Sequence, residues 1–230
     1  VDAVIDNSGV VEIMKTEFAE RSGRLYLKDN LTIHNVEARN YLASASGKKY
    51  DLIMLPRQES FGGSAGINAL QENYTMTLES FSLMWDMLSA EGVISISSWI
   101  DYPPRASLKI LATLAETAEQ KAAGRPEEHI AAIRSWGTIT YIMSKQPLTV
   151  ADSERIRELC GELFFDPLLL PGLADDERQN YHMSDDDDFF TNVDRIIKGD
   201  NDIFSEYGFM ISPATDNKPY FSQFLRLKNI

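Results

Sequence analysis

The sequence predicts an α/β fold of the Rossmann-like type, a doubly wound sheet with an antiparallel hairpin at its end and a C-terminal extension of helix and loop. Short apolar runs alternate with segments of helical periodicity through residues 1–147. The run YDLIML at 50–55 is almost wholly apolar, which is typical of a parallel strand covered on both faces. Two β-rich runs, 129–136 and 138–145, are separated by Gly137 alone, which predicts the hairpin.

The N-terminal elements are predicted from changes of hydrophobic period. VDAVI (1–5) and LTIHNV (31–36) have the composition of strands, and EARNYLASA (37–45) has that of a helix. The segment 8–23 is predicted to be a helix that stops near Gly23, because four apolar residues share one helical face. These residues are Val10, Val11, Met14 and Phe18.

The central segment predicts two longer helices around another strand. A helix over 78–92 precedes the strand VISISSW at 93–99. A second helix over 103–124 begins with two prolines, which are favoured in a first helical turn. The apolar side of the first helix consists of Phe81, Met84, Trp85 and Leu88.

The C-terminal segment predicts mostly helix and loop. A helix covers about residues 150–165, a loop-like segment covers 166–187, and another helix covers 189–200. We therefore expect a Rossmann-like domain over 1–147 and an extension over 148–230 that packs on it.

Composition narrows the class of partner. The net charge of −13 argues against a nucleic-acid surface and favours a neutral or a cationic ligand, such as a polyamine. Cys160 is the single cysteine and is predicted to be a buried or half-buried apolar residue in a reducing compartment. No stretch has the roughly 18 consecutive apolar residues that span a bilayer, and the first residues lack the pattern of a signal peptide.

Acidic residues follow two of the predicted parallel strands. Ligands of open α/β sheets bind beyond the carboxyl ends of the strands, where this sequence has Asp6 and Glu37, and further along the chain Pro56 and Asp101. A carboxylate there can accept hydrogen bonds from a ribose diol or an adenine amine. The alternative interpretation of Asp6 and Glu37 is a helix cap, which the sequence Asp-Asn-Ser at 6–8 also suits.

The order of these motifs resembles a known family. VDAVIDNSGVVEIMK, LTIHNVEARNYL, YDLIML and LSAEGVISISSW succeed one another as in the spermidine synthase family and in the class I S-adenosylmethionine-dependent methyltransferase fold. The resemblance implies S-adenosylmethionine or its decarboxylated form as co-substrate, and no metal. It places Glu37 and Ala38 at the nucleoside. The family's ribose-binding acid aligns with Ile5, so that Asp6 lies one residue late.

Two departures from the family pattern bear on activity. The family's Asp-x-x-Asp-Pro segment aligns with Pro56-Arg57-Gln58-Glu59-Ser60, and proline cannot accept the proton of an attacking amine. Glu59 is the catalytic and substrate-binding candidate that is left, and its alternative interpretation is a charge on a loop surface. The family's Gly-rich turn after the first strand has no counterpart here, so we expect the chain to begin at the second strand of a longer protein.

The second half extends the resemblance. SWGTITYIMSKQPLT, FDPLLLPGL, SDDDDFF and ISPATDNKPYFSQFLR resemble the C-terminal region of large bacterial spermidine synthase-like proteins that carry an N-terminal membrane domain. The resemblance implies a cytoplasmic domain tethered to the inner membrane, and association into a homodimer. It also places the turn-rich segment PATDNKPYF near the carboxyl edge of the sheet, with Asp216 and Tyr220 as substrate-binding candidates.

Several other features have simpler interpretations. The segment 60–71 is predicted to border a crevice for a nucleoside and an amine, and otherwise is a plain connector. The run Asp185–Asp188 is predicted to be solvated or to begin a helix, because consecutive carboxylates point in different directions and seldom share one ion. Trp136 is predicted to lie in the core. The three histidines, His34, His129 and His182, are predicted to be structural.

Three functions are therefore open. In the first, the chain is a transferase that uses S-adenosylmethionine or its decarboxylated form, as the strand order and Glu37-Ala38 indicate. Alternatively it is a non-catalytic sensor or binding domain, as Pro56 indicates, or a scaffold for oligomerisation. Turnover would distinguish the first from the others, and ligand binding without turnover would select the second.

Overall fold

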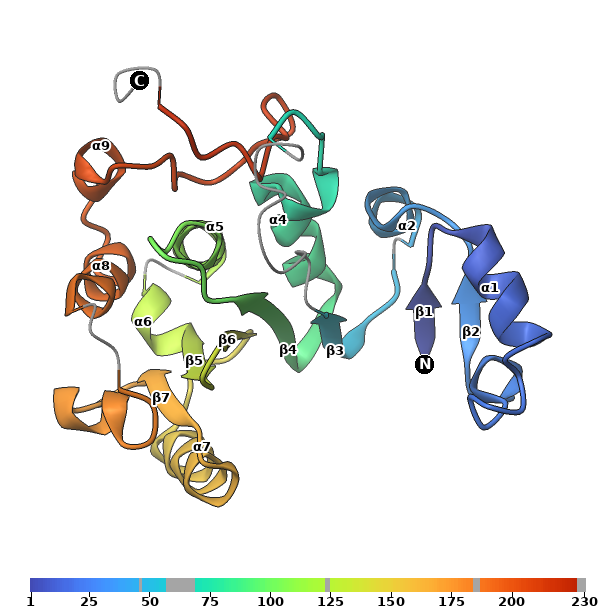
Figure 1. Cartoon of the computed structure of the whole chain (residues 1–230), viewed down its shortest axis with the longest axis horizontal. Coiled ribbons are helices and arrows are strands. Elements are labelled where there is room, and N and C mark those ends of the chain that lie inside the picture. The colour runs from blue at the N-terminus through green and yellow to red at the C-terminus, as the bar shows by residue number, and fades with distance from the viewer. Residues whose placement is uncertain (46, 57–68, 123–124, 184–186, 227–230) are drawn as a thin grey trace. The chain divides into compact units, whose positions relative to one another are not determined.

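The computed structural model describes residues 1–45, 47–56, 69–122, 125–183 and 187–226 (Figure 1). The chain divides into two compact units, Val1–Lys48 and Lys49–Ile230. Helices and strands alternate along both units, so the predicted α/β class with a mixed sheet is confirmed. We call the two parts unit 1 and unit 2.

Unit 1 is built around two short parallel strands. β1 and β2 pair with Ala3 opposite Ile33, which brings the carboxyl ends of both strands to the same edge. Asn7 begins the first helix, because its side chain accepts a hydrogen bond from the Val10 amide at 3.1 Å. The elements are β1 (Asp2–Val4), α1 (Ser8–Lys15), η1 (Leu25–Leu27), β2 (Thr32–His34) and α2 (Ala38–Ser44).

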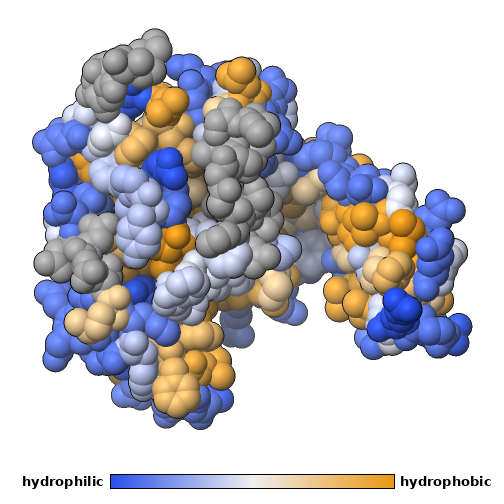
Figure 2. Space-filling model, viewed as in Figure 1, coloured by the Kyte–Doolittle hydropathy of each residue, from blue (hydrophilic) through white to orange (hydrophobic). Residues whose placement is uncertain are grey.

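The predicted helix over 8–23 is wrong in length and in its apolar face. α1 ends at Lys15, where the Thr16 hydroxyl bonds back to the Glu12 carbonyl at 2.8 Å and competes with continuation of the helix. Val11 is the buried residue of this helix. Apolar side chains are instead exposed on unit 1 (Figure 2), namely Val10, Ile13, Phe18, Leu25 and Leu27.

Unit 2 contains a five-stranded mixed sheet in the order β3-β4-β6-β5-β7. β3 and β4 are parallel, and the remaining neighbours are antiparallel. β5 and β6 form the predicted hairpin, with Ala132 opposite Tyr141. The strands are β3 (Tyr50–Leu55), β4 (Leu88–Trp99), β5 (Ile130–Arg134), β6 (Thr138–Ser144) and β7 (Asp166–Leu169).

β3 lies at an end of this sheet, and the prediction that it is covered on both faces is wrong. Its Leu52 and Met54 side chains are 48% and 63% exposed. Within the described residues the strand pairs with β4 alone, so an apolar sequence typical of a central strand occupies an edge. Gly92 of β4 is required at this contact, because a Cβ there would lie 2.6 Å from the Tyr50 carbonyl oxygen.

Helix α5 lies at the centre of unit 2 and is buried over almost its whole length. It contacts α4 and α8 as well as strands β4 and β6 (Figure 1). The helical elements are η2 (Tyr74–Met76), α4 (Leu78–Met87), α5 (Ala106–Lys121), α6 (Pro126–His129), α7 (Val150–Leu163), η3 (Asp175–Gln179), α8 (Asp187–Ile197) and α9 (Ile203–Glu206).

The loop predicted over 166–187 contains regular structure, so that prediction is wrong in part. β7 extends the sheet beside β5, and η3 follows it. The buried Asp166 carboxylate stabilises this arrangement by accepting the amides of Tyr181 and His182, both at 2.8 Å. Such long-range partners give no local signal in the sequence, which explains the error.

Two single-residue predictions have opposite outcomes. Cys160 on α7 is buried as predicted, and its burial raises the thiol pKa to about 11. Trp136 is 80% exposed, so its predicted place in the core is wrong. It lies in the tight β5–β6 turn, which the hydrogen bond from the Ser135 amide to the Thr138 carbonyl closes, and this position turns the ring away from the sheet.

Candidate functional site

The carboxyl ends of β1 and β2 bring two predicted nucleoside-binding residues to one edge. Asp6 follows β1 by two residues, and Glu37 follows β2 by three. Asn35 joins the two chain segments, because its side-chain amide donates to the carbonyls of Ile5 at 2.7 Å and Asp6 at 3.2 Å. The two carboxylates therefore follow neighbouring parallel strands, as a site of the Rossmann type requires.

The two carboxylates differ in their local roles. A Glu37 oxygen accepts the Asn40 amide at 2.9 Å and so caps α2, of which Ala38 is the first residue. Asp6 has no such role in α1, since Asn7 caps that helix. Asp6 is exposed and Glu37 is half-buried. The capping alternative thus describes Glu37 and not Asp6.

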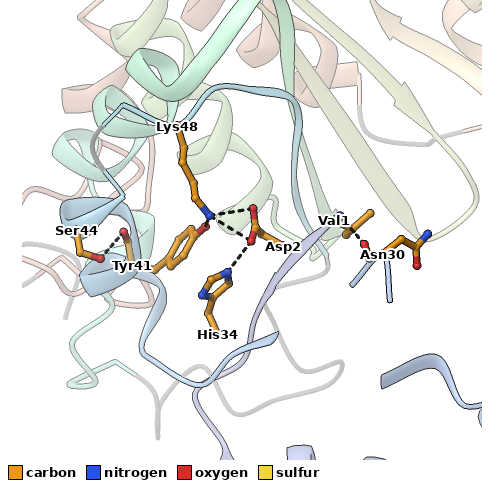
Figure 3. A network of polar contacts seen from close by, with 7 residues as sticks. All are labelled: Val1, Asp2, Asn30, His34, Tyr41, Ser44 and Lys48. Carbon is orange, nitrogen blue, oxygen red and sulfur yellow. Dashed lines mark hydrogen bonds and ion pairs between the residues drawn. The ribbon is translucent and has the colours of Figure 1, made fainter. Parts of the chain in front are cut away.

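A polar cluster on unit 1 fixes α2 against the two strands (Figure 3). Asp2 of β1 lies 2.6 Å from His34 Nε2, and the Lys48 ammonium lies 3.4 Å from the same carboxylate and from the Tyr41 hydroxyl. The His34 and Tyr41 rings are 4.6 Å apart. The hydrogen bond with Tyr41, followed by that with Asp2, raises the pKa of Lys48. The cluster orients α2 and therefore Glu37 at its start.

Unit 2 holds a second group of polar residues where the C-terminal segment meets the start of α4. The Thr77 hydroxyl donates to Asp216 Oδ1 at 2.7 Å, and the Asp216 amide donates to Glu79 Oε2 at 2.9 Å. Thr77 also accepts the Ser80 amide at 3.3 Å and so caps α4. This arrangement brings residue 216 to a helix that begins more than a hundred residues earlier in the chain.

Two tyrosines and another carboxylate complete this group. Partial burial and a hydrogen bond to Glu72 raise the pKa of Tyr74, and the nearby Tyr220 and Asp216 add to the effect. Asp216 and Tyr220 are half-buried, whereas Glu72 is exposed. We call this group the Asp216 cluster, and its members are Glu72, Tyr74, Thr77, Glu79, Asp216 and Tyr220. Carboxylates and phenol rings are the groups that bind organic ammonium ions.

The remaining predicted site residues are not brought together. Glu59 and most of the segment 60–71 lie outside the described residues. Pro56 follows β3 directly. The Asp101 carboxylate accepts hydrogen bonds from the backbone amide of Arg105 at 3.0 Å and from its guanidinium at 2.9 Å. These bonds fix the turn that leads into α5.

The described part of the chain shows neither a metal site nor a membrane-spanning helix. Within it, no group of three or more histidine, cysteine, aspartate or glutamate side chains is arranged to hold an ion. None of its helices combines the length and the apolar composition needed to cross a bilayer.

Sequence reasoning did not identify three members of the Asp216 cluster, Glu72, Thr77 and Glu79. Thr77 precedes a periodic apolar run, and Glu79 lies in its first turn, so a search for helix caps could have found both residues. No local pattern could pair them with Asp216, because the partners are 139 and 137 residues apart.

Comparisons with known proteins give similarity of structure only. No protein-family model and no curated protein sequence matches the chain. It is similar to a "probable spermidine synthase" from Corynebacterium glutamicum, with 18% identity, a TM-score of 0.49 and coverage of 70% of this chain and 54% of that one. The chain thus spans about half the length of that protein.

Two further solved structures are similar over comparable lengths. Human methyltransferase-like protein 13 in complex with SAH has 15% identity and a TM-score of 0.47, and the match covers 70% of this chain and 69% of that one. Precorrin 8W decarboxylase from Methanobacterium thermoautotrophicum has 13% identity and a TM-score of 0.38, and the match covers 62% of this chain and 68% of that one.

Proposed function

We propose that this chain binds an S-adenosyl nucleoside, S-adenosylmethionine or its decarboxylated form, through Asp6 and Glu37 of unit 1. The position of these two carboxylates after neighbouring parallel strands carries the proposal. The nucleoside's hydroxyls and adenine amine would donate hydrogen bonds to the carboxylates. In this proposal Ala38, the first residue of α2, would lie next to the adenine, as the resemblance implies.

We further propose that an organic amine of the polyamine class binds the Asp216 cluster of unit 2. An ammonium ion would be attracted by Glu72, Glu79 and Asp216 and would stack on the faces of Tyr74 or Tyr220. The net charge of −13 also favours the approach of a cation. The half-burial of Asp216 supports this site over a fully solvated carboxylate, because partial desolvation strengthens an ion pair.

S-adenosyl nucleosides and amines are together the substrates of one reaction class, transfer of an alkyl group from a sulfonium to an amine. The amine nitrogen forms a bond to the carbon next to sulfur, the carbon–sulfur bond breaks with its electrons leaving on sulfur, and the amine loses a proton. Pro56 follows β3 at the position where the resembled family has an acid, and proline cannot take that proton. Glu59 is the candidate proton acceptor in this proposal.

Pro56 favours a second function, a binding domain that holds the same ligands without turnover. Such a domain needs the carboxylates of both units but no proton acceptor. The two functions share their binding residues and differ only in product formation.

Titration calorimetry tests the nucleoside proposal with matched variants. We expect S-adenosylmethionine, decarboxylated S-adenosylmethionine or methylthioadenosine to bind the wild-type chain, and Asp6→Asn or Glu37→Gln to weaken binding roughly 10-fold, because each loses a charge-assisted hydrogen bond. A glutamine can still accept the Asn40 amide, so the α2 cap is kept. Asp29→Asn, an exposed change on unit 1, is the control. Equal affinity in all three variants would contradict the proposal.

Titration with spermidine tests the amine proposal separately. We expect Asp216→Asn to weaken spermidine roughly 10-fold and Asp176→Asn, an exposed change on unit 2, to leave it unchanged. Methylthioadenosine release in the presence of decarboxylated S-adenosylmethionine and spermidine would select the transferase. Binding of both ligands without product would select the binding domain.

A further inference from the structure

The C-terminal segment of residues 209–226 forms a strap over α4 and α5 (Figure 1). Its two legs are joined by the hydrogen bond from the Met210 amide to the Phe224 carbonyl at 2.8 Å. The turn between the legs carries Asp216 and Tyr220 to the Asp216 cluster. The position of the strap therefore decides the geometry of that cluster.

One contact of the strap is made with the start of α4. The Asn73 amide donates to the Pro219 carbonyl at 2.7 Å, and the Leu78 amide donates to the Ala214 carbonyl at 2.9 Å. These two bonds flank the Thr77–Asp216 hydrogen bond. They fix the tip of the strap, residues 214–219, in position. The second leg, residues 220–226, is fixed by other residues.

The second leg is held by Lys109 of α5. The Lys109 ammonium lies 3.4 Å from the Tyr220 carbonyl oxygen and 3.5 Å from that of Gln223. It also lies 5.6 Å and 5.5 Å from the ring centroids of Phe221 and Phe224. These two carbonyls and two rings surround the ammonium on the strap side, and we call them the Lys109 cage.

The burial of Lys109 is unusual for a lysine. The residue is 2% exposed, and among the described residues no carboxylate forms an ion pair with it. An apolar side chain of the same length would fill this space without the cost of desolvating a charge. What an apolar residue could not do is donate hydrogen bonds to the two strap carbonyls, which indicates that those bonds are the reason for a lysine here.

We propose that Lys109 is a positioning residue for the Asp216 cluster, since its ammonium fixes the 220–224 turn of the strap and thereby the placement of Tyr220 and Asp216. The inference rests on the proposed amine site for its functional meaning. Its structural content, that Lys109 controls the contact between strap and α4, stands independently of any ligand.

Hydrogen exchange on the ligand-free chain tests the structural content. Lys109→Met keeps the length and removes the donors, so we expect the amides of Asn73, Leu78 and Asp216 to exchange about 10-fold faster than in the wild type. Lys145→Met is the matched control. Lys145 also donates to two backbone carbonyls, those of Trp85 and Leu88 at 3.2 Å and 2.9 Å, but at the other end of α4.

Spermidine titration of the same variants tests the functional content. We expect Lys109→Met to weaken spermidine about 5- to 10-fold, Lys109→Arg, which keeps the charge and the donors, to recover most of that loss, and Lys145→Met to bind as the wild type. If Lys109→Met does not fold, Phe221→Leu, which opens the Lys109 cage and leaves the lysine in place, is expected to give the same faster exchange.

The outcomes separate this inference from the proposed function. Faster strap exchange in Lys109→Met alone supports the positioning role even if no amine binds the wild type, a result that would overturn the amine proposal only. Unchanged exchange and unchanged spermidine affinity in Lys109→Met overturn the positioning role. Equal effects of Lys109→Met and Lys145→Met also overturn it, because both would then act through general loosening of α4.

Discussion

Two of the buried cations of unit 2, Arg134 and Lys109, are compensated in different ways, and the comparison shows what each position is for. Arg134 is 3% exposed and lies 3.4 Å from Asp166, which is itself fully buried. Lys109 is 2% exposed and has carbonyls and aromatic rings but no carboxylate partner within the described residues. The charge of Arg134 is compensated by the Asp166 carboxylate, whereas the charge of Lys109 is compensated by carbonyl dipoles and the faces of aromatic rings.

The Arg134 region has the character of a structural network. Its guanidinium donates to the carbonyls of Arg178 and His182 and lies 5.4 Å from the Phe190 ring centroid. Burial lowers the pKa of Arg134, and Asp166 opposes that effect. An arginine remains charged regardless, so this network cannot respond to pH in the physiological range. It fastens β5 to the segment after β7.

The Lys109 region can change its charge. Burial lowers the pKa of Lys109 to about 8, because desolvation disfavours the ammonium form and no carboxylate of the described residues opposes this effect. The comparison therefore teaches that burial alone does not define a role. Arg134, which is paired with Asp166, keeps its charge at every physiological pH. Lys109, which contacts carbonyls and aromatic rings, can lose its charge as the pH rises, so the strength of its contact depends on pH.

The largest expected effect comes from breaking the compensated pair. Asp166→Asn removes the charge opposite Arg134 and one acceptor of the Tyr181 and His182 amides. We expect the free energy of unfolding to fall by about 3 to 5 kcal/mol, because an uncompensated charge remains buried. Urea denaturation would measure this change, with Asp176→Asn as a control. A loss below about 1 kcal/mol would mean that the pair contributes little to the fold.

The pH dependence of stability should reveal the uncompensated cation. The folded pKa of Lys109, about 8, lies below the ordinary value of 10.5 for an unburied lysine. The unfolded chain therefore binds more protons between these pH values, so the contribution of Lys109 to stability rises from about pH 8 to about pH 10.5. The rise is about 3 kcal/mol at most.

The variant Lys109→Met isolates this effect from other titrating groups. The difference in unfolding free energy between wild type and Lys109→Met should shift in favour of the wild type as the pH rises through this range. At pH 7 we expect the two to differ by less than about 1 kcal/mol, because relief of the buried charge offsets the loss of two hydrogen bonds. Parallel pH curves for the two proteins would show that Lys109 has an ordinary pKa.

The sequence allowed correct prediction of the features that local patterns determine. The α/β class, the antiparallel hairpin at Gly137 and the burial of Cys160 all follow from periodicity and composition, and all three are observed. Local patterns also predict that Asp6 and Glu37 lie shortly after the first two strands, and their role in binding a nucleoside stays a prediction.

Features that depend on distant partners could not be predicted. β3 has the composition of a central strand yet lies at a sheet edge, because the number of neighbours of a strand is not encoded in the strand itself. Lys109 looks like an ordinary polar residue of an amphipathic helix, and the strap carbonyls that it contacts lie more than a hundred residues later in the chain. The exposure of Trp136 likewise results from the turn geometry and not from its residue type.

The smallest expected effect concerns the start of α4, where the strap meets the helix. Thr77→Val keeps the shape of the side chain and removes the hydroxyl that caps the helix and donates to Asp216. We expect a loss of about 1 kcal/mol in unfolding free energy, as for other N-cap residues. Thr149→Val, which removes the cap of α7, is a matched control, because the capping box of that helix is formed by Thr149 and Asp152, which are not members of the Asp216 cluster. Both variants should lose similar stability, but only Thr77→Val should weaken spermidine, since Asp216 then loses the partner that orients its carboxylate. Equal spermidine affinity in the two variants would show that the Thr77 hydroxyl does not determine the geometry of the Asp216 cluster.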